Sequence, residues 1–323
     1  MSFNTNYILI ECFKECINIV ENILLNQEII ALDCEGVYLS KEGQLTLLQI
    51  GLSSGEVYIF DILKGGSLMF YGLEKTTTLT TNEKKLCKGL KHVLESKKII
   101  KILHDCRSDW ESLLYQYEIR LHNFIDTQEV YFIYNLFLNK VVDKPISLGN
   151  FIKGIKGEKL IYKQKFKNLM SENPEYWGNR PLDKEALLYA AQDVKYLINS
   201  WFIISSYLNE NLTEMSYFLS IIKVINKDLF DQFKKHLVSS VLKLIECKDD
   251  NKNIQYNNNK DSISSLLTNY DYVENFFQFK KLYAHDDELN YKIDNLINAG
   301  LFYKNKQRDY FNKLIINTNE SEK

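Results

Sequence analysis

Four acids and one tyrosine are the side chains of this 323-residue chain best suited to metal chemistry. Asp33 and Glu35 lie two residues apart, Asp109 stands alone, and Tyr189 precedes Asp193 by four positions. Each lies where a different predicted strand or helix would end near one point. Hard divalent cations prefer carboxylate oxygens, and a pair of such cations can catalyse displacement at phosphorus. We therefore expect a cage for two metal ions and an enzyme that cleaves phosphodiesters.

The first two acids end an apolar run, Ile29-Ile30-Ala31-Leu32, which predicts a buried strand. Alternate strand residues share a face, so Asp33 and Glu35 project together while Cys34 points the other way. Two adjacent carboxylates repel each other unless a cation lies between them. An isolated Asp-x-Glu is usually a solvated strand end. Here the apolar run, and the pattern over residues 45–51 that resembles a hairpin partner, favour a built site.

The third acid follows a second apolar run over residues 99–103, which predicts a buried strand leading into a helix. Asp109 would then lie near the start of that helix, where the helix dipole favours negative charge. Asp105 competes for the same role, and the local sequence leaves both open. Either acid could instead be a simple N-cap.

The last pair lies in a helical pattern over residues 187–197. Tyr189 and Asp193 are four residues apart and would present their side chains together. Between them, Ala190 and Ala191 are small enough for the helix to approach a sheet closely. This spacing is common by chance, so its weight comes from the other acids.

Together these motifs resemble the DEDD superfamily of 3′-to-5′ exonucleases, in its tyrosine-containing, RNase D-like subgroup. The resemblance runs from a predicted strand at residues 7–10 to about residue 207. It rests on Asp33-Cys34-Glu35-Gly36, on His104 through Asp109, on Tyr189-x-x-x-Asp193, and on the flanking strings Asp126-Thr127-Gln128 and Arg180-Pro181-Leu182. The Asp-Cys-Glu-Gly form, His104-Asp105-Cys106-Arg107 and Asn173-Pro174-Glu175-Tyr176-Trp177 look most like the egalitarian branch.

This resemblance implies an RNase H-like mixed α/β sheet and a 3′-to-5′ exonuclease that uses two Mg²⁺ or Mn²⁺ ions. It implies that Asp33 bridges both ions and that Glu35 and Asp193 complete the site beside the attacking water. It also assigns the second ion to Asp109 rather than Asp105. Tyr189 is expected to orient the water, because a phenol with a pKa of about 10 is a poor base at neutral pH.

Two other functions remain open on the sequence. The egalitarian branch includes RNA-binding adaptors that keep an exonuclease-like fold without catalysis, and fold does not fix function. A weaker alternative is an interaction module whose acids bind metal only for stability. The complete set of acids favours catalysis. Preference for RNA or DNA depends on contacts to the 2′-hydroxyl, which no motif reveals.

Charge limits how the chain can hold single-stranded nucleic acid, its expected partner. With 40 basic and 42 acidic residues the net charge is -2, so any grip must be local. The best candidate is a lysine-rich stretch interleaved with aromatic residues, comprising Lys153, Lys156, Lys159, Lys163, Lys165 and Lys167. A solvated helix face is the more ordinary interpretation of such a stretch. His104 could also approach the substrate, although a lone histidine at a strand end is more often structural.

Strand patterns near residues 7–10, 29–34, 45–52, 57–62 and 99–104 predict an α/β fold, with a mixed sheet flanked by helices. The exonuclease-like domain is expected over residues 1–207. A helical extension over 208–247, a polar linker over 248–261 and a small helical segment over 262–323 should follow.

No apolar run is long enough to cross a bilayer, and no secretory signal is evident. We expect an intracellular protein of the cytoplasm or nucleus, with no membrane contact. The six cysteines lack paired zinc-ligand spacing and are expected to be free thiols.

Overall fold

A computed structural model describes residues 6–72, 88–138, 140, 142, 144–208 and 210–225, with scattered positions from 227 to 238. The linker predicted at 248–261 and the helical segment predicted at 262–323 lie outside the described residues. Among the described helices, none is both long and apolar enough to cross a bilayer.

A six-stranded sheet forms the centre of the fold, in the order β1-β4-β3-β2-β5-β6. The strands are β1 Tyr7–Ile10, β2 Ile29–Val37, β3 Gln44–Gly51, β4 Val57–Asp61, β5 Ile100–Leu103 and β6 Phe124–Asp126. β3 pairs antiparallel with β2 and β4, whereas the β1–β4, β2–β5 and β5–β6 pairs are parallel. The mixed sheet expected from the sequence is therefore confirmed, and β6 is an addition to it.

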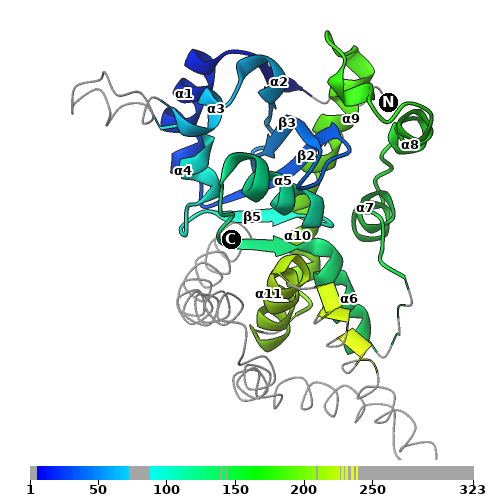
Figure 1. Ribbon diagram of the computed structural model, residues 1–323. Coiled ribbons are helices and arrows are strands. Elements are labelled where there is room, and N and C mark those ends of the chain that lie inside the picture. The colour runs from blue at the N-terminus through cyan, green and yellow to red at the C-terminus, as the bar shows by residue number, and fades with distance from the viewer. Residues whose placement is uncertain are drawn as a thin grey trace, which may run out of the picture.

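Helices flank this sheet, with α1, α3 and α4 on one side of the view and α7, α8 and α9 on the other (Figure 1). The α-helices are α1 Phe13–Asn22, α2 Ile62–Gly65, α3 Leu68–Tyr71, α4 Leu90–Leu94, α5 Arg107–Tyr117, α6 Thr127–Phe137, α7 Leu148–Lys156, α8 Lys163–Glu172, α9 Lys184–Lys195, α10 Leu197–Ser205 and α11 Glu210–Ile225. Two short 3-10 helices, η1 Leu24–Asn26 and η2 Tyr176–Gly178, complete the set.

The core is built on β2, whose residues Ile29 to Leu32 are buried on both faces, as expected of a central strand. Helix α9 packs across β2, β3 and β4. This approach is close: a Cβ atom on Gly51 of β3 would lie 2.8 Å from the carbonyl oxygen of Val194. Ala190 and Ala191 are fully buried at the contact, as the small residues of that helix predicted.

Helix α11 lies against α6 and β6 (Figure 1). Its buried side chains Tyr217, Ile221 and Val224 belong to the same apolar core as the sheet. A smaller apolar cluster joins α11 to α6 through residues such as Leu219 and Ile133. The first part of the predicted extension over 208–247 therefore packs directly on the sheet domain.

Candidate metal centre

Strand β2 and helix α9 together bring three acids to one point. Oxygen atoms of Asp33, Glu35 and Asp193 all lie within 4.8 Å of one another. Asp33 and Glu35 project from the same face of β2, just before an irregularity in its pairing with β3 between Glu35 and Gly36. Asp193 is buried on α9. The structure thus brings together three of the four acids that the sequence singled out.

The position of α9 is fixed at its N-terminal end. Asp183 caps the helix by accepting a hydrogen bond from the Ala186 amide at 2.8 Å. Just before it, Arg180 makes two bonds to the buried carboxylate of Asp61, from Nε at 2.6 Å and from Nη2 at 2.8 Å. Bidentate arginine–carboxylate pairs are strong and directional. This pair ties the loop before α9 to the end of β4, which sets where Tyr189 and Asp193 meet the sheet.

Asp109 is the fourth acid, and it is buried in the first turn of α5. It accepts hydrogen bonds from the backbone and the thiol of Cys34, the residue between Asp33 and Glu35. The negative charge of Asp109 raises the pKa of Asp33. Asp105 lies elsewhere: its exposed carboxylate pairs with Lys223 at 2.8 Å. The structure therefore places Asp109, and not Asp105, beside the other acids.

Burial raises the pKa of each of these four carboxyls, and the charges of other acids in the cluster add to the rise for Asp33 and Glu35. The pKa of Asp33 lies well above its ordinary value because of burial and then the charges of Asp109 and Asp193. Burial raises the pKa values of Glu35 and Asp193, and the positive charge of Lys163 opposes the rise in both. Burial raises the pKa of Asp109 to about 7. A nearby cation would stabilise the ionised form of carboxyls whose pKa values are raised in this way.

Two oxygen atoms support a cation site directly. Oδ1 of Asp109 and Oδ1 of Asp193 are buried and accept no hydrogen bond from any residue that the structure describes. A buried carboxylate oxygen without a partner is costly, and a bound cation would satisfy it. The donors of the cluster are all carboxylate oxygens, which suits Mg²⁺ or Mn²⁺ better than softer metals. The residues present therefore fit divalent ions.

One protein cation, Lys163, reaches the cluster from the start of α8. Its Nζ lies 2.5 Å from Oδ2 of Asp193 and 3.2 Å from the hydroxyl of Tyr189. The ammonium also lies 4.6 Å from the centre of the Tyr189 ring, a cation–π distance. Among the lysines predicted to contact nucleic acid, Lys163 is the one that the structure brings into the acid cluster.

Tyr189 is held in place by packing and by polar contacts. Its ring is buried against Phe166, with centroids 4.8 Å apart, and against Trp177 at 6.0 Å. Burial and then the charges of Asp193 and Glu35 raise its pKa well above the ordinary value of 10.0. The phenol therefore stays protonated at neutral pH and can serve as a hydrogen-bond donor.

The remaining candidate residues lie away from the acids. Nε2 of His104 lies 3.0 Å from the carbonyl oxygen of Ile146, and Nδ1 lies 2.8 Å from the hydroxyl of Thr127, so both ring nitrogens are engaged within the fold. Lys153 is exposed on α7. Lys165 is exposed on α8, where it pairs with Glu185.

Sequence reasoning missed two features of this region. It gave Lys163 no contact with the acids, because the partners lie 26 and 30 residues away along the chain. It also overlooked Lys223. A lysine inside the apolar string Ile221-Ile222-Lys223-Val224 indicates a buried lysine, which needs an acidic partner.

A family model described as a 3′-5′ exonuclease matches residues 10–212, which is more than half of the chain. The chain belongs to this 3′-5′ exonuclease family. The matched region contains all four acids, Tyr189 and Lys163.

Curated relatives and a solved structure extend this result. The chain is 27% identical over 215 residues to the mouse piRNA biogenesis protein EXD1, covering 65% of this chain and 35% of that protein. It is 24% identical over 182 residues to an Egalitarian protein homolog of Caenorhabditis elegans, covering 54% of this chain and 28% of that protein. The chain thus spans about a third of the length of the relatives it matches.

The fold also matches an RNase D from Trypanosoma brucei, whose crystal structure is a complex with GMP. The TM-score is 0.50 at 21% identity, covering 72% of this chain and 64% of that chain. This likeness supports the fold inferred from the sheet order and the flanking helices.

Proposed function

We propose that this chain is a metal-dependent 3′-to-5′ exonuclease that hydrolyses phosphodiester bonds from the 3′ end of single-stranded nucleic acid. The observation that carries the proposal is the cluster of Asp33, Glu35 and Asp193, with oxygens within 4.8 Å of one another. Buried Asp109 lies beside it, and the ammonium of Lys163 faces Asp33, Glu35 and Asp193. A fold alone would not require so much uncompensated negative charge, because such a cluster repels itself.

The cluster is suited to two Mg²⁺ or Mn²⁺ ions. We assign one ion to Asp33, Glu35 and Asp193, and the other to Asp33 and Asp109. When bound, two such ions activate water and stabilise the charge on the attacking and leaving oxygens of an in-line displacement. The unpartnered oxygens of Asp109 and Asp193 are the atoms that would gain most from these ions.

The protein itself supplies orientation and a further positive charge. The protonated hydroxyl of Tyr189 orients the attacking water by hydrogen bonding. Four carboxylates balance the charge of two divalent ions, so the ammonium of Lys163 remains to face the negative charge of the substrate phosphate. Lys163 is part-buried, which strengthens such a contact relative to one on the surface.

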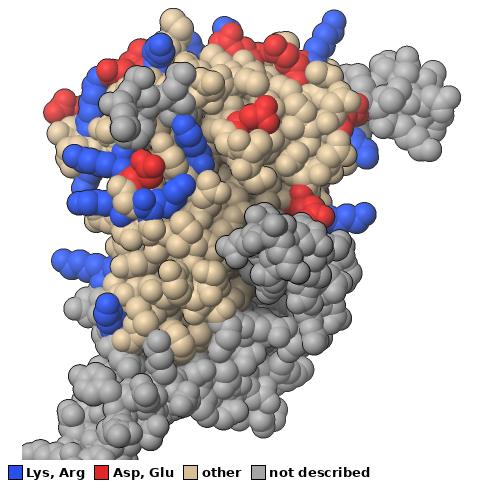
Figure 2. Space-filling model, turned by 180° about the vertical axis from the view of Figure 1, so that it is seen from behind, with Lys and Arg blue, Asp and Glu red and all other residues tan. Residues whose placement is uncertain are grey.

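Surface lysines provide the longer-range attraction. Seen from behind, Lys and Arg side chains gather along the flank on which α7 and α8 lie in Figure 1 (Figure 2). Lys153 and Lys165 are exposed on these helices. We propose that they contact backbone phosphates, which is a sequence-independent and salt-sensitive interaction. The relatives named for piRNA biogenesis make RNA the substrate to test first.

The test is cleavage of single-stranded RNA and DNA, labelled at the 3′ or the 5′ end, with Mg²⁺ or Mn²⁺. Release of labelled mononucleotide from the 3′ end at once, and progressive shortening of the 5′-labelled strand, are the expected results. Asp33→Asn and Asp193→Asn serve as matched controls. Equal cleavage by these variants would refute the assignment, and binding without cleavage by the wild type would favour the RNA-binding adaptor.

The role of Tyr189 is tested separately by Tyr189→Phe. This change removes the hydroxyl but keeps the ring that packs on Phe166 and Trp177. We expect turnover to fall by about 10–100-fold, because the water loses its orientation, while Mn²⁺ affinity measured by calorimetry stays nearly unchanged. An unaltered cleavage rate would remove Tyr189 from the mechanism.

A further inference from the structure

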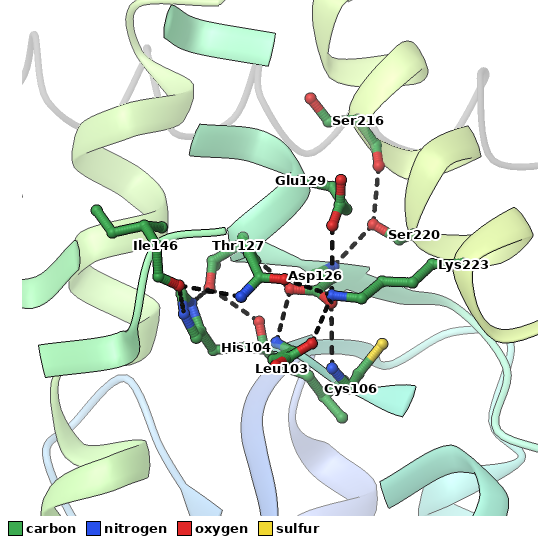
Figure 3. A network of polar contacts seen from close by, with 12 residues as sticks. Leu103, His104, Cys106, Asp126, Thr127, Glu129, Ile146, Ser216, Ser220 and Lys223 are labelled. Carbon is green, nitrogen blue, oxygen red and sulfur yellow. Dashed lines mark hydrogen bonds and ion pairs between the residues drawn. The ribbon is translucent and has the colours of Figure 1, made fainter. Parts of the chain in front are cut away.

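A second group of acids converges on one lysine of α11, Lys223 (Figure 3). Nζ of Lys223 lies 2.8 Å from Oδ2 of Asp126, 2.8 Å from Oδ1 of Asp105 and 3.3 Å from Oε1 of Glu129. It also donates a hydrogen bond to the side-chain oxygen of Gln128 at 2.7 Å. The side chain of Lys223 is 5% exposed and that of Asp126 is fully buried. A buried ammonium with this many partners is a specific contact rather than a surface ion pair.

Asp126 connects Lys223 to the turn between β5 and α5 by hydrogen bonding to that turn. Its Oδ1 accepts a hydrogen bond from the Asp105 amide at 2.9 Å, and its Oδ2 accepts one from the Cys106 amide at 3.1 Å. Asp105 has a φ of 61°, in the left-handed region that costs energy for a residue with a side chain. The turn therefore depends on the two bonds that Asp126 accepts.

The same turn sets the start of α5. Cys106 is the N-cap residue of this helix, and Asp109 is its third residue. The first turn of a helix follows the geometry of its cap. The carboxylate of Asp109 therefore takes its position from the backbone of Asp105 and Cys106.

Helix α11 is fixed to β6 by a second contact. The hydroxyl of Ser220 accepts a hydrogen bond from the Asp126 amide at 2.8 Å and donates one to the carbonyl of Ser216 at 2.7 Å (Figure 3). Ser220 and Lys223, three residues apart, present together on one face of the helix. Both the backbone and the side chain of Asp126 are thus held by α11.

We propose that Lys223 is a positioning residue for the metal centre: it neutralises Asp126, which holds the turn at Asp105 and Cys106 and through it the carboxylate of Asp109. This inference rests on the proposed function for its consequence, which is that the catalytic unit includes α11. The unit would then extend beyond residue 212, where the family match ends, and beyond the boundary predicted at residue 207.

Removing the ammonium of Lys223 tests whether the turn at Asp105 and Cys106 depends on α11. In Lys223→Met, three acids face one another without the central cation, and Asp126 loses the charge that favours its ionised form. The amides of Asp105 and Cys106 then lose a well-placed acceptor. The first turn of α5 would loosen, and Asp109 would hold a metal ion less well.

The experiment compares the wild-type 323-residue chain with its Lys223→Met, Lys223→Arg and Lys101→Met variants. Lys101 is a matched control, because it is also buried but donates to the carbonyls of Ser96 at 2.6 Å and Ile99 at 3.0 Å, near the opposite end of β5. Mn²⁺ binding without substrate is measured by calorimetry. We expect Lys223→Met to weaken binding by roughly tenfold or more, the usual effect of losing a group that orients a metal ligand. Lys223→Arg should restore part of the affinity, and Lys101→Met should leave it unchanged.

Amide hydrogen exchange of the metal-free proteins gives a second readout. The amides of Asp105 and Cys106, which donate to Asp126, should exchange faster in Lys223→Met and not in Lys101→Met. Wild-type Mn²⁺ affinity together with unchanged exchange at these two amides would overturn the inference, whatever the melting temperature. Should Lys223→Met fail to fold, Lys223→Gln keeps an N–H donor without the charge and is judged by the same two measurements.

These readouts separate the two proposals. If the wild type binds Mn²⁺ but cleaves no substrate, the proposed exonuclease activity fails and the Mn²⁺ titration still decides the role of Lys223. If the wild type binds no Mn²⁺, both the proposed function and the link to a metal centre fail, and hydrogen exchange shows whether Lys223 holds the turn alone.

Discussion

Two groups of acids lie within this domain, and they differ in what neutralises them. In the first group Asp33, Glu35 and Asp193 face the ammonium of Lys163, and buried Asp109 lies beside them. The second group, Asp105, Asp126 and Glu129, faces Lys223, while Glu129 also pairs with Lys234 at 2.9 Å. Asp126 in addition accepts hydrogen bonds from the backbone amides of Asp105, Cys106 and Gln128.

The pKa values record this difference. Although burial opposes it, the charges of Lys223 and His104 lower the pKa of Asp126. Burial raises the pKa of Glu129, although the charges of Lys223 and Lys234 oppose the rise. In the first group the pKa of every acid is raised, chiefly by burial. The second group therefore contains its own counter-charges in Lys223 and Lys234, whereas the first lacks positive charge that a metal can supply.

Asp33→Asn should give the largest effect and should separate activity from stability. We expect cleavage to fall by at least about 10³-fold, because Asp33 is assigned to both ions. The metal-free protein should be at least as stable as the wild type, since one repulsive charge is removed. Cleavage is followed on labelled RNA, and unfolding is followed by urea titration in EDTA. A clear loss of metal-free stability would identify Asp33 as structural and weaken the whole site.

Asp126→Asn should give the opposite pattern. Loss of this charge leaves Lys223 buried with weaker partners and weakens the bonds to the turn, so we expect a loss of about 3–5 kcal/mol in the free energy of unfolding. Asp105→Asn is the matched control, because the Asp105 carboxylate is 61% exposed and should contribute less than about 1 kcal/mol. If the two variants lose the same stability in urea unfolding, the Asp126 network is not a structural centre.

The sequence predicted the acids of the metal centre because their signals are local. Asp33 and Glu35 end an apolar strand, and Tyr189 and Asp193 are one helical turn apart, so each pair could be placed from a few neighbouring residues. Five strands were predicted for the same reason. β6 has only three residues, too few for a periodic pattern, and was not predicted.

The partners of these acids depend on contacts between distant segments. Lys223 and Asp126 are 97 residues apart, and Lys163 and Asp193 are 30 residues apart. No local pattern sets such distances, since they follow from how helices pack on the sheet. The lysine-rich stretch around α8 therefore looked uniform in sequence, although the structure gives Lys163 and Lys165 different partners.

Lys163→Met should sharpen the contrast between the two groups. In the metal-free protein Asp193 loses its ion pair at 2.5 Å, and we expect a loss of about 1–3 kcal/mol, moderated by the 30% exposure of the Lys163 side chain. Added Mn²⁺ should then raise the melting temperature more than in the wild type, because it replaces a missing cation. Lys165→Met, which breaks an exposed pair with Glu185 and a contact 6.0 Å from the centre of the Phe166 ring, should change neither value. An equal Mn²⁺-induced shift in wild type and Lys163→Met would count against a shared cation site.

The response of stability to pH should differ in sign between the acids of the metal centre and Asp126. In an unfolded chain Asp titrates near about 3.9. Folded Asp109 has a pKa of about 7, so the folded state holds a proton that the unfolded state has lost. Between roughly pH 4 and 7 the free energy of unfolding of the metal-free protein should therefore fall as pH rises. The raised pKa values of Asp33, Glu35 and Asp193 act in the same direction.

Asp126 acts in the opposite sense, because its pKa is lowered on folding and its contribution is lost as pH falls below about 4. Urea unfolding in EDTA across this range should show both slopes, and Asp109→Asn should flatten the upper one. Saturating Mg²⁺ should remove or reverse the upper slope, since the ions bind the ionised carboxylates and compete with protons. The slope of unfolding free energy against pH above pH 4 could stay the same in Asp109→Asn and with Mg²⁺. That result would mean that the four acids do not form a cation site.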